Sequence, residues 1–145
     1  MKNTLALIFS LLLLAATQVQ AQDAKVEPSI PANSVTRNVD GIYQAQFGVG
    51  AYGRSFSVSA EVTLKGAEGT WRTQMTGNNC LNQIAPVTVT SSTDSELKFV
   101  AAYSKTLNGC PDFNVSLKRL NDKTFAGSGI TSSGMTIAEI KMNKQ

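Results

Sequence analysis

Residues 55 to 64 alternate polar and apolar side chains at every position. Successive residues of a β-strand point to opposite faces, whereas helices repeat every 3.6 residues, so this pattern predicts a strand with one buried face. The apolar side chains on that face are Phe56, Val58, Ala60, Val62 and Leu64.

Similar alternation recurs along the chain at residues 43–49, 71–75, 87–89, 97–101 and 113–117, with two final runs at 124–130 and 135–142. The last run changes phase near Ile137, which a β-bulge there would explain. No segment beyond the N-terminal leader has a helical period of useful length. We therefore predict an all-β fold, a single antiparallel meander of about eight strands that forms a small β-barrel or a barrel-like sandwich.

The N-terminus has the three parts of a secretory signal peptide. Lys2 precedes an apolar run over residues 5–16, and small residues end at Ala21. The run is shorter than the roughly 20 apolar residues of a membrane span. We expect cleavage after Ala21, a periplasmic or secreted mature protein, and no stable membrane anchor.

The remaining chain divides by composition. Residues 22–38 are polar, contain Pro28 and Pro31 and lack a sustained period, which predicts a flexible N-terminal arm. Residues 39–145 then form the barrel-like domain. Secreted proteins reside in oxidising compartments, so Cys80 and Cys110, the two cysteines of the chain, are expected to form a disulfide.

Composition excludes most common catalytic sites. The chain has no histidine, which removes Ser-His-Asp triads, Cys-His pairs and His-ligated metal sites. A net charge of +3, with lysine and arginine scattered singly, argues against nucleic acid as a partner. Carboxylate pairs of the glycosidase type remain conceivable, but no pattern places two together among Glu61, Asp94, Glu96, Asp112 and Glu139. We predict no enzyme activity, no cofactor and no metal site.

A meander brings alternate connections to the same end of the domain. Residues 50–54, 76–84, 104–111 and 131–134 would share one end, and the predicted disulfide joins two of these connections. Function on rigid scaffolds concentrates in such longer loops. The candidate binding surface is therefore Tyr52, Arg54, Asn78, Asn79, Asn82, Lys105, Asn108 and Asp112.

Two resemblances bear on the family. Gly69-Thr70-Trp71-Arg72 resembles the G-x-W motif of lipocalins, eight-stranded meander barrels with an open end that admits a ligand. In lipocalins the motif opens the first strand, whereas here it falls on the third, so their ligand binding does not carry over. The segments 86–90 and 109–112 resemble small uncharacterised exported proteins of proteobacteria, a resemblance that implies no activity.

These observations favour an exported, monomeric, non-catalytic binding module whose partner is an unknown protein or surface glycan. The alternatives are a lipocalin-like carrier of a small ligand and, less favoured, a carboxylate-dependent hydrolase. A carrier needs a hollow interior. Bulky residues expected to point inward would fill a small barrel instead: Tyr43, Phe47, Phe56, Trp71, Phe99 and Phe113.

Overall fold

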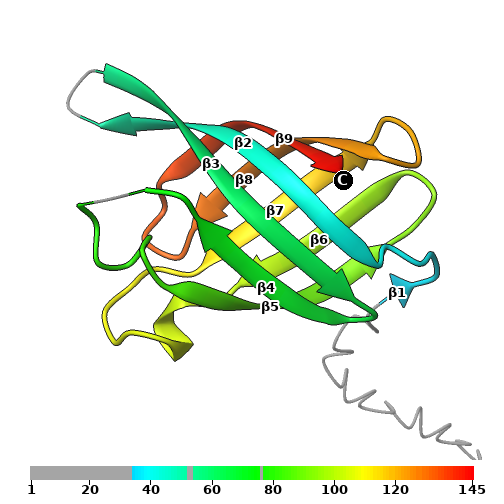
Figure 1. Ribbon diagram of the computed structural model, residues 1–145, viewed down its shortest axis with the longest axis horizontal. Coiled ribbons are helices and arrows are strands. Elements are labelled where there is room, and N and C mark those ends of the chain that lie inside the picture. Colours follow the sequence, from blue (N-terminus) through cyan, green and yellow to red (C-terminus); the bar gives the residue numbers. More distant parts are fainter. Residues whose placement is uncertain (1–33, 52–53, 76) are drawn as a thin grey trace, which may run out of the picture. The chain divides into compact units, whose positions relative to one another are not determined.

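Eight antiparallel strands, β2 to β9, follow one another in chain order around a closed barrel (Figure 1). Each pairs with the next strand in the chain, and β2 also pairs with β9, which closes the barrel. The predicted all-β meander is confirmed, and the choice between barrel and sandwich is settled as a barrel. The strands are β1 (Ser34–Val35), β2 (Gly41–Ala51), β3 (Arg54–Lys65), β4 (Glu68–Thr73), β5 (Ile84–Ser92), β6 (Glu96–Ala101), β7 (Phe113–Arg119), β8 (Thr124–Thr131) and β9 (Thr136–Lys144).

The computed structural model describes residues 34–51, 54–75 and 77–145. The predicted signal peptide and most of the predicted arm lie outside these ranges. The chain divides into two compact units, Met1–Ile30 and Pro31–Gln145, and the described residues all belong to the second. Within them the one helical element is a 3-10 turn, η1 (Tyr103–Lys105). None of their helices is long and apolar enough to cross a membrane.

Alternate residues of the strands fill the barrel, as the sequence pattern predicts. Val58, Ala60, Val62 and Leu64 of β3 are all buried. Phe56 continues the same alternation but is 47% exposed. β3 pairs with β4 only from Ala60 onward, so Phe56 lies on a part of β3 that extends past its neighbour.

The predicted bulge near Ile137 is confirmed in β9. Lys141 pairs with Gln46 but Ala138 pairs with Gly48, so β9 has one residue more than β2 over this stretch. Glu139 lies within this bulge. Its φ of +54° is in the left-handed region, which is rare for residues other than glycine. The phase change lets Ile137, Ile140 and Met142 all be buried.

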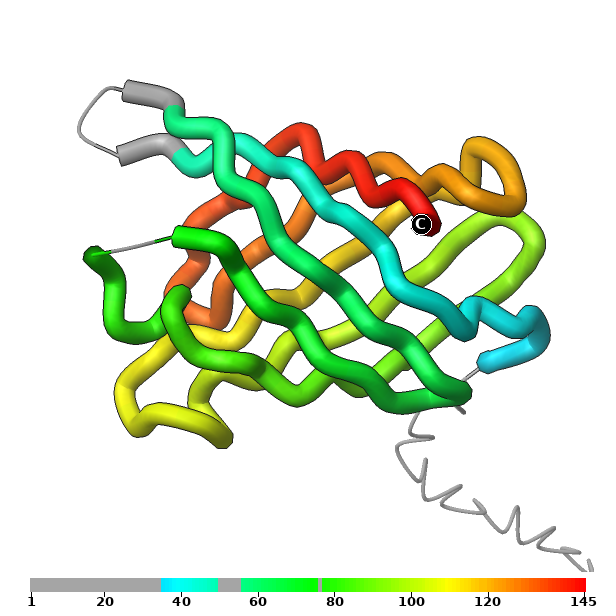
Figure 2. The backbone as a smooth tube through the Cα atoms, in the orientation of Figure 1, coloured from blue at the N-terminus to red at the C-terminus, as the bar shows by residue number. Residues whose placement is uncertain are grey.

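The two ends of the barrel differ (Figure 2). One end, here called the turn end, has the short connections 66–67, 93–95 and 120–123. The other, here called the loop end, has the longer connections 74–83 and 102–112 together with the turn 132–135. The connection 52–53 lies outside the described residues.

The turn end is sealed by the segment that precedes β2. β1 pairs in parallel with β5, and the backbone amides of Thr36 and Arg37 both donate to the carbonyl oxygen of Ser92. Val39, 2% exposed, accepts a hydrogen bond on its carbonyl oxygen from the Tyr43 hydroxyl at 2.7 Å. Residues 34–38, which sequence composition assigns to the arm, are thus hydrogen-bonded to the barrel.

Two arginines complete this seal. The Arg37 guanidinium pairs with Asp94 in the 93–95 turn and, at 2.7 Å, with Asp122 in the 120–123 turn. Arg119 donates from Nε to the Thr93 carbonyl oxygen at 3.2 Å, and its guanidinium lies 4.6 Å from the centre of the Phe125 ring. Beneath these contacts Val39, Tyr43 and Phe125 are at most 2% exposed.

Gly127 in β8 has no room for a side chain. A Cβ atom there would lie 2.2 Å from the carbonyl oxygen of Ser116 and 2.9 Å from the Cα of Leu117. At Gly48 in β2 the nearest atom would be the Ala138 carbonyl oxygen at 3.8 Å, an ordinary contact. The two glycines therefore form a matched pair for testing the barrel wall.

We expect Gly127→Ala to lower the free energy of unfolding by about 1–3 kcal/mol, because the backbone of β7 must move away. Gly48→Ala is expected to be neutral or to stabilise by up to about 1 kcal/mol, since alanine restricts the unfolded chain more than glycine. Urea unfolding monitored by Trp71 fluorescence measures both. Equal effects of the two substitutions would show that β7 and β8 do not approach as closely as described.

Candidate binding site at the loop end

The Cys80–Cys110 disulfide joins the two longest loops of the loop end, 74–83 and 102–112. This confirms both the predicted pairing and the prediction that these connections share one end. Cys110 is 5% exposed and Cys80 is half-buried. The Thr106 hydroxyl adds a link from loop 102–112 to the first residue of β5 by donating to the Ile84 carbonyl oxygen at 3.1 Å.

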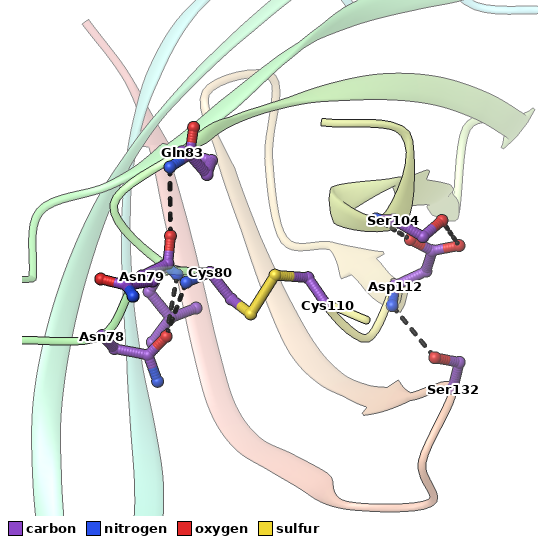
Figure 3. The surroundings of a disulfide bond; sticks show 9 residues. Asn78, Asn79, Cys80, Gln83, Ser104, Cys110, Asp112 and Ser132 are labelled. Carbon is purple, nitrogen blue, oxygen red and sulfur yellow. Dashed lines mark hydrogen bonds between the residues drawn. A yellow bond between two sulfur atoms is a disulfide. The ribbon is translucent and has the colours of Figure 1, made fainter. Parts of the chain in front are cut away.

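Two of the predicted binding residues shape these loops. Asn78 Oδ1 accepts hydrogen bonds from the backbone amides of Cys80 at 2.9 Å and Leu81 at 3.1 Å, which folds the loop just before the disulfide (Figure 3). Asparagine often takes this part because its short side chain reaches its own backbone two residues on.

Asp112 ties its loop to the neighbouring turn. Its carboxylate accepts hydrogen bonds from the Ser104 backbone amide at 2.8 Å and the Ser104 hydroxyl at 3.0 Å (Figure 3). Its backbone amide donates to the Ser132 hydroxyl at 3.0 Å. The side chains of Asn78 and Asp112 therefore hold the loops in place, and a partner would compete with these bonds for them.

Four predicted residues remain available for contact. Asn79, Asn82, Lys105 and Asn108 are exposed, and their side chains make no hydrogen bond to any other described residue. Tyr52 lies outside the described residues. Arg54 begins β3, but its side chain is not described. The structure thus places Asn79 and Asn82 on one disulfide-linked loop and Lys105 and Asn108 on the other.

A pocket of about 140 Å3 opens among these loops. Its floor and walls are apolar and buried or half-buried, and its rim includes the exposed residues Asn78 and Met135. The apolar lining comes from β2, both linked loops, β7, the turn 132–135 and β9, and it includes Phe47, Val49, Leu81, Tyr103, Phe113 and Ile137.

Sequence alternation does not predict this pocket, because its walls come from strands and loops that only the tertiary fold brings together. One local signal exists. Leu81 is the single apolar side chain besides Cys80 in the polar segment 77–83, and it is 9% exposed. An apolar residue in an otherwise polar loop indicates that the loop folds back over the barrel.

Below the pocket lies a buried chain of hydrogen bonds. Trp71 Nε1 donates to Thr73 Oγ1 at 2.9 Å, and Thr73 Oγ1 lies 2.7 Å from the Tyr103 hydroxyl oxygen. Burial raises the pKa of Tyr103, an effect that the hydrogen bond with Thr73 opposes. Tyr103 is therefore neutral at physiological pH, and its hydroxyl is occupied within the protein.

Aromatic rings occupy the centre of the barrel. Trp71 is 1% exposed and stands between Phe47 and Phe99, with ring centres 5.6 Å and 5.9 Å away. Farther toward the turn end, Tyr43 and Phe125 pack edge to face at 5.9 Å. These rings lie side by side along the barrel interior, and Phe47 also lines the loop-end pocket.

Three of the five carboxylates considered for hydrolysis are engaged by other side chains. Asp94 is paired with Arg37 at the turn end, Glu96 is bonded to Lys98 at 2.8 Å, and Asp112 is bonded to Ser104 at the loop end. Hydrogen bonds from Lys98 and Ser91 lower the pKa of Glu96, which keeps it ionised. Within the described residues, no group of three or more aspartates, glutamates or cysteines is placed to hold a metal ion.

Comparison with known proteins identifies no family. No family model matches the chain, and no curated protein matches it. Among solved structures, a redesigned β-barrel is similar, with 14% sequence identity over 73% of this chain and 90% of that chain and a TM-score of 0.48.

Proposed function

We propose that this protein is an exported, non-catalytic binding module and that the loop end of its barrel is the binding end. The observation that carries the proposal is the apolar pocket of about 140 Å3 that opens among the disulfide-linked loops. Concave apolar sites with a few polar groups around them are the usual form of a binding site. The sealed turn end presents charged and tightly turned residues instead.

Two further features support export and binding. The disulfide between Cys80 and Cys110 suits an oxidising compartment, which agrees with the signal-peptide pattern of residues 1–21. The exposed side chains of Asn79, Asn82 and Asn108 each offer both a hydrogen-bond donor and an acceptor next to the pocket's loops.

The size of the interior speaks against a carrier of larger ligands. Drug-sized ligands occupy sites of roughly 300–1,000 Å3, well above the volume of this pocket. Trp71, Tyr103 and Phe99 fill the space below it. A lipocalin-like carrier is therefore the weaker alternative.

Photo-crosslinking in the source cells tests which end binds. A photoreactive amino acid is placed at Asn82 or Asn108 of the loop end and, as a matched control, at Asn121 or Lys123 of the turn end. All four positions are exposed. We expect discrete crosslinked products from the loop-end positions and none from the turn-end positions.

Cell fractionation and mass spectrometry of the same protein test export, with a mature N-terminus expected at Gln22. If only the turn-end positions gave crosslinked products, the assignment of binding to the loop end would be wrong. No product from any position would refute the interaction module, and an uncleaved cytoplasmic chain would refute export.

A further inference from the structure

The loop-end pocket has the size of a single aromatic ring. An apolar cavity of about 150 Å3 lined by leucine, isoleucine and phenylalanine side chains binds benzene in another protein. This pocket, at about 140 Å3, is nearly as large and has a similar apolar lining. It differs in having a rim at the protein surface, through which a ring can enter without unfolding.

The lining favours an aromatic group over an aliphatic one. Tyr103 and Phe113 are tilted by 55° with their ring centres 5.0 Å apart, an arrangement that a third ring can extend with edge-to-face contacts. Sulfur atoms also line the pocket, from Met135 and from Cys80 of the disulfide. Sulfur–aromatic contacts add to the attraction.

The pocket is poorly suited to a charged group. None of its lining residues ionises near neutral pH. Most polar side-chain atoms of the lining are already bonded: Asn78 Oδ1 accepts from two backbone amides, and the Tyr103 hydroxyl is held by Thr73, which leaves the Asn78 side-chain nitrogen at the exposed rim. Thr131 Oγ1 accepts from the Met135 backbone amide at 2.9 Å.

The hydrogen bonds within the lining favour a polypeptide over a glycan as the partner. A sugar ring carries several hydroxyl groups, and most of them would lose their water in the pocket without gaining a side-chain partner, which is unfavourable. A phenylalanine side chain has no such groups. The polypeptide backbone on either side of it can bond to the exposed amides of Asn79, Asn82 and Asn108, which lie on the same two loops.

We propose that the loop-end pocket is a receptor site for one phenylalanine side chain displayed by a partner polypeptide. The inference rests on the proposed function and specifies its partner as a polypeptide rather than a glycan. The ring would pack on Tyr103 and Phe113, and Met135 would lie at the edge of the site.

Methyl NMR of the disulfide-bonded chain tests the proposal. Met135 lines the pocket, whereas Met142 is buried in β9 and pairs with Phe125, so the two methionine methyl signals form a site reporter and an internal control. The probes are blocked tripeptides with glycine on either side of phenylalanine, leucine or alanine, together with benzyl alcohol and maltose.

We expect the phenylalanine peptide to shift the Met135 signal saturably, with a dissociation constant of about 0.1–1 mM, and to leave Met142 unmoved. The leucine peptide should bind at least about threefold more weakly, because it lacks ring contacts. Val49→Phe should weaken the phenylalanine peptide at least about tenfold by filling the pocket from β2. Val100→Phe, the same change at a half-buried valine of β6 that does not line the pocket, should alter affinity less than about twofold.

Different outcomes overturn different statements. If no peptide shifts Met135, or if Val49→Phe binds as well as the unaltered chain, the pocket is not the receptor site. If benzyl alcohol binds as tightly as the phenylalanine peptide, the ligand is a small aromatic molecule and not a polypeptide. If maltose shifts the Met135 signal, the partner is a glycan. Loop-end crosslinks in cells would still uphold the proposed function in each case.

Discussion

Trp71→Ala is expected to lower the free energy of unfolding by about 3–5 kcal/mol, the range for removing a fully buried large side chain. Trp71 is 1% exposed and contacts the rings of both Phe47 and Phe99. The substitution also removes the indole N–H that donates to Thr73. Urea unfolding followed by far-ultraviolet circular dichroism measures the change.

Two variants separate packing from hydrogen bonding at this position. Trp71→Phe keeps a ring against Phe47 and Phe99 but removes the N–H donor, so a smaller loss of about 1–2 kcal/mol is expected. Leu120→Ala changes a side chain that is 60% exposed and should cost less than about 0.5 kcal/mol. A loss below about 1.5 kcal/mol for Trp71→Ala would contradict the packing described for the barrel centre.

Trp71 illustrates what the sequence predicts well. Alternation in Trp71 and Thr73 places both side chains inside, and both are buried. The same rule finds the inward faces of the other strands, because burial on one face of a barrel wall imposes a period of two. Its limit is shown by Phe56, whose position in the alternation is right but whose strand runs past its neighbour.

The site is less accessible to sequence reasoning than the fold. The meander rule correctly brings Cys80 and Cys110 to one end, because antiparallel neighbours must reverse direction there. Residue type alone does not separate Asn78, which folds its own loop, from Asn79, whose side chain faces solvent. That distinction depends on loop geometry, which has no period to detect.

Tyr103 is the clearest omission. It stands two residues after Ala101, in phase with the run 97–101 but beyond its predicted end, and it is fully buried in the short 3-10 turn η1. Its ring forms part of the pocket, and its hydroxyl bonds to Thr73 on the far strand β4. A contact between segments 30 residues apart cannot be inferred from local pattern.

The same separation in sequence makes the disulfide a large contributor to stability. Removing it by Cys80→Ser with Cys110→Ser is expected to lower the free energy of unfolding by about 3–4 kcal/mol, the chain-entropy value for a closed loop of 30 residues. For a domain of this size the midpoint of thermal unfolding should fall by roughly 15 °C. Calorimetry with and without a thiol reductant measures both quantities.

A thiol reductant provides the control for the disulfide prediction. It should lower the unfolding midpoint of the unaltered chain to that of the double variant and leave the variant itself unchanged. Equal midpoints in all four samples would show that the loops are held without the cross-link.

The disulfide should also matter for binding. Because Cys80 and Leu81 line the pocket, loosening their loop should lower the affinity for the phenylalanine peptide even below the unfolding temperature, where the barrel remains intact. Full retention of peptide affinity in the folded double variant would mean that the bonds from Asn78 and Thr106 suffice to shape the site.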